Sequence, residues 1–250
     1  VTWFYLNDTP DQATWLDDDE KQALKTMIAR EQELAIAHVA TPRSTLREVL
    51  TPAVLLYTLA YFCLTNTLSA INIWTPQILQ SFNTGSSNIV IGLLAAIPQF
   101  CTILGMIWWS RRSDRLKERK KHTILPYLFA AAGWMLASAT DHSLIQLLGI
   151  IMASTGSFTA MAIFWTTPDQ VISLQSRAVA LAVINAIGNV GSAVSPLLIG
   201  ILRDATGSFS SGLWFVAGLL VVGALVLTRI PMTQRDQQRN DHVPEPHRQH

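Results

Sequence analysis

Two asparagines, Asn185 and Asn189, have the residue type and spacing in this chain best suited to binding a polar ligand. They lie four residues apart in an apolar stretch, so on a helix they project from the same face, one turn apart. A primary amide buried in hydrocarbon without a hydrogen-bond partner costs several kcal/mol. The pair therefore indicates a wet cavity. The alternative is that both amides hydrogen-bond between packed helices.

Further polar and aromatic side chains occur in other apolar stretches. Tyr61 belongs to a row of polar residues that recurs every three or four positions, so the row shares one helical face. The other members of this row are Thr58, Thr65, Ser69 and Asn72. Tyr61 and Gln99 either line a cavity or join helices, whereas Ser and Thr are more typical of helix packing. Trp165 is either an interface anchor or an aromatic wall of the cavity.

The apolar stretches contain no Asp, Glu, Lys, Arg or His. They cover residues 52–109, 123–140, 143–166 and 178–202. This composition excludes a catalytic carboxylate or a metal cluster within them, so we expect no catalytic residue, no metal and no cofactor, and a membrane enzyme is disfavoured. Proton coupling needs an ionisable group at membrane depth. If the protein is proton-coupled, we expect that group in a part outside this sequence.

Membrane-spanning helices must position these residues. Only 14% of the 250 residues are charged, against roughly 25% in soluble domains. The stretches between the charge clusters approach the roughly 20 residues that cross a bilayer. The sequence therefore predicts an all-α membrane protein with six spans, at about 52–74, 89–109, 123–140, 143–166, 178–202 and 213–229. The very short connection between the third and fourth spans predicts a helical hairpin.

A basic segment at residues 109–122 sets the orientation of these spans. It holds seven Lys/Arg and two carboxylates, and we expect it to be a loop. Loops rich in Lys and Arg lie on the cytoplasmic side of membrane proteins. With six spans, 17 of the 18 Lys/Arg fall on the side of this loop and only Arg203 falls opposite. Both ends of the six-span unit are therefore predicted to be cytoplasmic.

Polar segments flank the six spans. Residues 7–51 are predicted to form a cytoplasmic segment with an amphipathic helix within 15–37, and residues 230–250 a disordered tail. Residues 1–6 read as the end of a preceding transmembrane helix. Because the chain also lacks an initiator Met, we expect its N-terminal part to be missing.

Several segments resemble a known family. SRRSDRLKERK, residues 110–120, resembles the cytoplasmic loop signature of the major facilitator superfamily, with Ser110 and Lys117 in place of the family's glycines. FWTTPDQ (164–170) and the segment 176–213 resemble its anion:cation symporter branch. Two further segments resemble the 4-hydroxyphenylacetate permeases of enteric bacteria within that branch; they are residues 57–83 and 127–142.

This resemblance implies the C-terminal six-helix half of a twelve-helix transporter whose substrate lies between two halves. It implies that the substrate site is lined by Tyr61, Trp165, Asn185 and Asn189, with Gln99 as a further candidate from its own span. It also implies a gating role for Asp114 and Arg115, in which Asp114 bonds a neighbouring helix end in one conformer and releases it in the other. The absent N-terminal half is implied to hold an anion-binding Arg and a proton-carrying carboxylate.

We therefore predict proton-coupled uptake of an aromatic organic anion, such as 4-hydroxyphenylacetate, across the bacterial inner membrane by alternating access. The expected partners are this anion, protons, the lipid bilayer and the N-terminal six-helix half; nucleic acid is not expected. One alternative is a symporter of another organic acid, of the sugar acid, tartrate or phthalate type. A second alternative is a six-span membrane protein that does not transport.

Overall fold

The computed structural model describes residues 12, 16–37, 51–82, 87–116, 118–140, 142–168, 171–172 and 176–230. The chain divides into two units, residues 1–47 and 48–250. In the first unit, helix α2 (Asp18–Ala37) begins with three carboxylates, which favour the positive end of the helix dipole. The predicted helix end at residues 1–6 and the tail from residue 231 lie outside the described residues.

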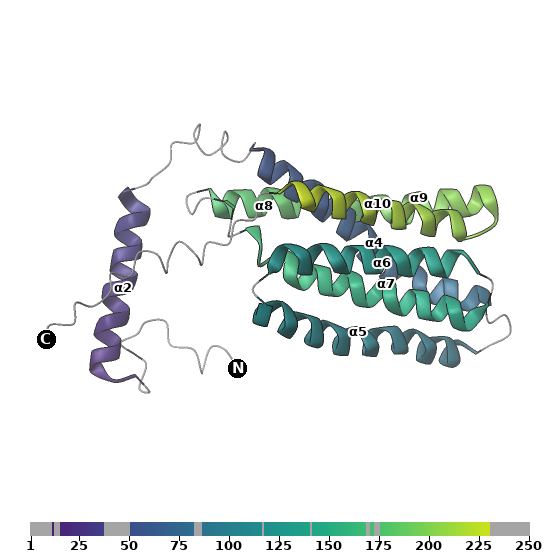
Figure 1. Cartoon of the computed structure of the whole chain (residues 1–250), viewed down its shortest axis with the longest axis horizontal. Helices are drawn as coiled ribbons and strands as arrows, with labels where there is room; N and C mark the ends of the chain where they lie inside the picture. The colour runs from purple at the N-terminus through teal and green to yellow at the C-terminus, as the bar shows by residue number, and fades with distance from the viewer. Residues whose placement is uncertain are drawn as a thin grey trace, which may run out of the picture. The chain divides into compact units, whose positions relative to one another are not determined.

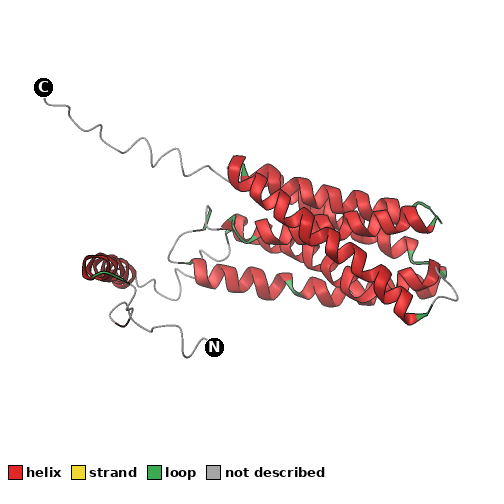
Figure 2. Cartoon of the chain, turned by 90° about the horizontal axis from the view of Figure 1, so that it is seen from below, coloured by secondary structure: helices red, strands yellow, loops and turns green. Residues whose placement is uncertain are grey.

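The second unit is a bundle of lengthwise helices (Figures 1 and 2). Its helices are α4 (Pro52–Phe82), α5 (Asn88–Leu116), α6 (Arg119–Ser138), α7 (Ser143–Phe164), α8 (Arg177–Gly188), α9 (Val190–Thr206) and α10 (Ser210–Arg229). Helix α7 packs on α5 and α6, α6 packs on α10, and α4 packs on α7, α8, α9 and α10. The short α6–α7 connection therefore joins two packed neighbours, as the sequence predicted.

Five stretches of the described residues are long and apolar enough to cross a membrane. They are α4, α5, α7, the stretch from α8 through α9, and α10. Helix α6, which was also predicted to span, has 20 residues but begins with Arg-Lys-Lys-His, so its apolar part is shorter. Its remaining turns lie in the bundle, where Tyr127 and Trp134 are fully buried.

The first predicted span ends too early. We expected it to end at Trp74, before Pro76, but α4 continues through Pro76 to Phe82. A proline removes one backbone donor and disturbs one turn. Here the residues beyond it keep the helix in place because Ile78 and Leu79 are buried in the bundle core.

The basic segment is mostly helical, so the prediction of a loop over 109–122 was wrong. Helix α5 runs on to Leu116 and α6 starts at Arg119. Arg, Lys, Leu and Glu are all good helix formers, and the basic side chain of Arg115 lies in the last turn of α5, where the helix dipole favours a cation. Charge marks where a helix leaves hydrocarbon, but it does not end the helix.

The fifth predicted span, 178–202, is two helices that meet at Asn189. The amide of Ser192 bonds to the Asn189 carbonyl, three residues back, instead of Gly188. The hydroxyl of Thr65 on α4 donates to the Gly188 carbonyl at 2.6 Å. Helix α4 thus supplies a hydrogen bond that the helix itself does not make.

A second hydroxyl of α4 acts in the same way one turn later. Pro196 has no N–H and cannot bond to the carbonyl of Ser192, four residues earlier. The Ser69 hydroxyl donates to that carbonyl at 2.7 Å. For Ser69 and Thr65, the helix-packing interpretation of the polar row therefore holds.

Helices α6 and α7 touch through glycines. A Cβ added at Gly149 would lie 2.6 Å from both the Ala137 nitrogen and the Gly133 oxygen. A Cβ added at Gly156 would lie 2.6 Å from the Pro126 oxygen. Small residues allow close backbone approach between membrane helices, so these glycines set the distance between α6 and α7.

A buried polar network joins the same two helices to α4. The Trp134 indole N–H donates to the Thr67 hydroxyl at 2.8 Å, and Thr67 lies 3.2 Å from the Ser157 hydroxyl. Ser157 donates in turn to the Ala153 carbonyl. Trp134, Thr67 and Ser157 are fully buried, so each polar atom depends on the others for a partner.

Replacing Thr67 with valine leaves the Trp134 indole N–H without its acceptor. We expect the free energy of unfolding to fall by about 1–2 kcal/mol, measured by thermal denaturation of the purified protein in detergent. Thr58→Val is the matched control because the Thr58 hydroxyl donates to Val54 within its own helix. Equal melting temperatures for the two variants would contradict a role of the network in stability.

Candidate functional site

A hollow of about 430 Å³ opens beside α4, α7 and α8. It is lined by Tyr61, Met161, Trp165, Leu181, Ala182 and Asn185. Three of the five predicted ligand-binding residues, from three helices or their ends, thus meet at one place. Of the two asparagines, Asn185 on α8 lines the hollow, whereas Asn189, where α8 and α9 meet, is not among its lining residues.

Aromatic rings form one wall of the hollow. The Tyr61 ring stacks on Phe164, with centroids 5.4 Å apart, and meets Trp165 edge-on at 4.9 Å. Tyr57 packs edge-on against Phe164 at 5.6 Å. Tyr57, Tyr61 and Phe164 are buried and Trp165 is partly exposed. The wall is therefore fixed by packing, and Trp165 is its exposed part.

Phe164 packs on Tyr61 and Tyr57 packs on Phe164, but neither ring lines the hollow, and neither residue was among the predicted site residues. Tyr57 lies four residues before Tyr61, so the two share a face of α4, and this spacing was a usable signal. Phe164 directly precedes Trp165, and no periodicity in the sequence shows that its ring turns inwards.

The two amides are hydrogen-bonded to each other. Asn189 Nδ2 donates to Asn185 Oδ1 at 2.7 Å and to the Asn185 carbonyl at 2.8 Å. Asn185 is exposed, so its amide N–H groups can donate hydrogen bonds to a ligand.

The position of Tyr61 depends on Gly188. A Cβ at Gly188 would overlap the Tyr61 ring. The glycine thus allows α4 and α8 to approach at the level of the hollow. The same glycine carbonyl receives the Thr65 hydroxyl, so α4 contacts the end of α8 through both a ring and a hydrogen bond.

Gln99 lies elsewhere. It is exposed on α5, next to the exposed Phe100, and is not among the residues that line the hollow. Its span was predicted correctly as apolar, but which face of a helix turns inwards depends on packing, and the sequence of α5 has little amphipathic asymmetry.

Asp114 and Arg115, the predicted gating residues, lie in the last turn of α5. Asp114 Oδ1 is 3.9 Å from Arg119 Nη2 in the first turn of α6. Asp114 and Arg115 are both exposed. The ion pair connects the two helix ends across the short turn, at the limit of the ion-pair distance, so its contribution to stability is small.

In the part of the chain that the structure describes, no group of three His, Cys, Asp or Glu side chains could hold a metal ion.

Comparisons with known proteins place these features in a family context. Residues 1–196 match the profile of the Major Facilitator Superfamily. A protein named as a tartrate transporter from Agrobacterium vitis is 36% identical over 227 residues, which cover 90% of this chain and 51% of the relative. A quinolone resistance transporter from Acinetobacter baumannii is 32% identical over 97% of this chain and 55% of its own length. A protein named as a galactarate/D-glucarate transporter from Escherichia coli is 30% identical over 57% of this chain. The chain spans about half the length of the first two relatives.

Proposed function

Because the chain belongs to the Major Facilitator Superfamily, we propose that this multi-pass membrane protein forms half of a secondary active transporter for a small organic anion. The anion would cross the bacterial inner membrane by alternating access. The observation that carries this proposal is the hollow in which Tyr61, Trp165 and Asn185 meet on one side of the helix bundle. Ligand sites in such repeat-built transporters lie between two halves.

The chemistry of the hollow suits an anion with further polar groups. The Asn185 amide can donate hydrogen bonds to a carboxylate or hydroxyl, and the Tyr61 and Trp165 rings offer an apolar face. The names of the relatives support a tartrate-type or sugar acid substrate. The aromatic wall supports an aromatic anion such as 4-hydroxyphenylacetate, which the sequence analysis put first and which is now the second candidate.

We further propose that a second six-helix half completes the site. The apolar stretches of this sequence carry only neutral side chains, which can orient an anion but cannot compensate its charge or carry a proton. The second half would supply a cation for the carboxylate and an ionisable group for proton coupling.

In this scheme the basic end of the bundle is cytoplasmic and takes part in gating. The Asp114–Arg119 pair would hold the ends of α5 and α6 together in one state. In the other state Asp114 would bond to a helix end of the second half. Arg115, on the next position of the same helix turn, would provide positive charge to the opposite half.

Uptake by cells tests this function. Cells that express the gene encoding this chain, in a host without its own uptake of the tested acids, should accumulate radiolabelled tartrate or 4-hydroxyphenylacetate above a vector control. Accumulation should saturate and should fall to the control level with a protonophore. Competition between the two acids identifies the preferred one. Uptake of neither acid, nor of galactarate, by cells with the protein in the membrane would contradict the proposal.

A further inference from the structure

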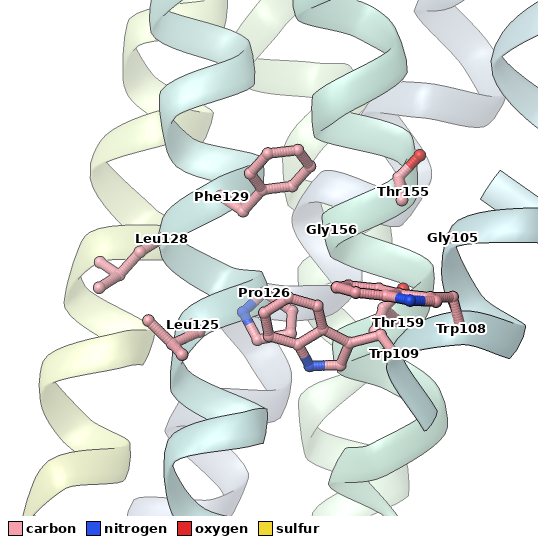
Figure 3. Close-up of a pocket in the computed structure, with 10 residues that line it drawn as sticks. All are labelled: Gly105, Trp108, Trp109, Leu125, Pro126, Leu128, Phe129, Thr155, Gly156 and Thr159. Carbon is pink, nitrogen blue, oxygen red and sulfur yellow. The ribbon is translucent and has the colours of Figure 1, made fainter. Parts of the chain in front are cut away.

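A second hollow, of about 530 Å³, lies between α5, α6 and α7 (Figure 3). It is lined by Gly105, Trp108, Trp109, Leu125, Pro126, Leu128, Phe129, Thr155, Gly156 and Thr159. We call it the α5–α6 groove. None of its residues lines the hollow beside Tyr61, so the two sites are separate.

The groove is apolar and exposed. Trp108, Leu125 and Phe129 are 59%, 47% and 44% exposed, so the walls are open to the surroundings of the bundle. Its lining covers one helical turn of α5, from Gly105 to Trp109, and one of α6, which corresponds to a length of roughly 6 Å. This apolar lining fits a short stretch of a flexible hydrocarbon chain.

Positive charge lies at one end of the groove. Arg111 and Arg112 follow Trp108 by three and four residues, so they lie about one turn further along the same face of α5. The Arg112 guanidinium is 5.8 Å from the centre of the Trp108 ring, which forms part of the groove wall. Both arginines are exposed. They continue the groove wall directly into a cationic surface.

The nearby carboxylates form ion pairs with other cations. Asp114 pairs with Arg119, and Glu118 pairs with Lys121 at 3.0 Å. Among the described residues, neither Arg111 nor Arg112 forms an ion pair. Two cations one turn beyond an apolar groove therefore lack a counter-charge from this part of the protein.

The floor of the groove is fixed at this charged end. The Trp109 indole N–H donates to the His122 carbonyl at 3.1 Å, which ties the last turns of α5 to the first turns of α6. His122 is buried, and its Nδ1 lies 2.7 Å from the Glu118 carbonyl. This hydrogen bond thus holds the ends of α5 and α6 together next to the groove.

We propose that the α5–α6 groove binds an anionic phospholipid. One acyl chain lies along Trp108, Leu125 and Phe129, and the phosphate lies between Arg111 and Arg112. Basic clusters at the membrane surface attract anionic lipids, by about 1 kcal/mol for each Lys or Arg near the surface, which corresponds to on the order of tenfold in affinity for two partly screened arginines. A zwitterionic lipid fills the groove equally well but gains less from the arginines, and a free phosphate ion gains nothing from the groove.

Brominated lipids test the proposal because bromine in an acyl chain quenches tryptophan fluorescence on contact. The purified product of the gene encoding this chain, in mixed micelles, is titrated with brominated phosphatidylglycerol and with brominated phosphatidylcholine. Phosphatidylglycerol should quench with an apparent affinity on the order of tenfold higher. Trp108→Phe should reduce the saturable part of the quenching and leave only the part from Trp109, the other tryptophan of the groove, which assigns the saturable part to the groove.

Charge variants complete the experiment. Arg111→Gln/Arg112→Gln should reduce the preference for phosphatidylglycerol to about twofold or less. Arg229→Gln is the matched control: it removes an exposed arginine at the end of α10, which packs on α6 and α4, and should keep the preference. Gel filtration of each variant checks the fold, which changes at these exposed positions should preserve.

Three results would overturn the proposal. The first is equal quenching by the two lipids in the unmodified protein. The second is a preference that survives the double arginine variant or is lost in the control. The third is relief of the preference by millimolar inorganic phosphate, which would assign the arginines to a soluble anion.

Discussion

Alanine in place of Gly149 is expected to lower the free energy of unfolding by about 3 kcal/mol, with a fall in melting temperature of roughly 10 °C. The added Cβ would lie 2.6 Å from backbone atoms of Ala137 and Gly133 and 2.9 Å from the Ala137 Cβ. Backbone atoms in the middle of a helix cannot rotate away as a side chain can. Helices α6 and α7 must therefore separate, which opens their whole interface.

Gly218→Ala is the control for this prediction. Gly218 lies on α10, and an added Cβ there has no atom within 4 Å. Alanine is a better helix former than glycine by about 1 kcal/mol, so this variant should match or exceed the stability of the unmodified protein. Thermal denaturation in detergent, followed by circular dichroism, measures both. A Gly149→Ala variant as stable as Gly218→Ala would show that the two helices are not in backbone contact.

Alanine in place of Asn189 is expected to reduce the initial rate of substrate uptake on the order of tenfold, the effect of losing about 1.4 kcal/mol of interaction. The change removes the donor that bonds to Asn185 Oδ1 and to the Asn185 carbonyl. Asn185 lines the hollow, so the substitution disturbs the polar side of the hollow. Uptake is normalised to the amount of protein in the membrane.

Ser195→Ala is the matched control on the same pair of helices. Ser195 is buried, and its hydroxyl has no hydrogen-bond partner among the described residues. Removing that hydroxyl costs no hydrogen bond, so uptake should stay near the unmodified level. Equal uptake by the two variants would remove Asn189 from the proposed site.

Much of the bundle was predictable because a helix that crosses hydrocarbon must be apolar over most of its length. Apolar length located the spans, and the one-turn spacing of Asn185 and Asn189 correctly placed the two amides side by side. Hydropathy does not detect where a helix stops, since the criterion for helix ends is the backbone hydrogen bond. For this reason α4 continues past Pro76 and α5 continues past Trp109, beyond the ends that hydropathy predicted for the two spans.

The missed features depend on contacts between distant segments. The break at Asn189 is stabilised by hydroxyls of α4, more than a hundred residues earlier in the chain. The inward turn of Phe164 and the outward position of Gln99 depend on which neighbour each helix meets. A single sequence shows whether each residue is polar or apolar, but it does not show which helices pack against each other.

The junction of α8 and α9 has a mechanical consequence. The Gly188 carbonyl loses its helical partner at the break and the Ser192 carbonyl loses its partner to Pro196, and the Thr65 and Ser69 hydroxyls donate to them instead. A change of the angle between α8 and α9 would therefore break fewer helix hydrogen bonds than bending an unbroken helix. Helix α9 has 17 residues and is therefore about 25 Å long. A rotation of a few degrees at Asn189 would displace the far end of α9 by about an ångström or more.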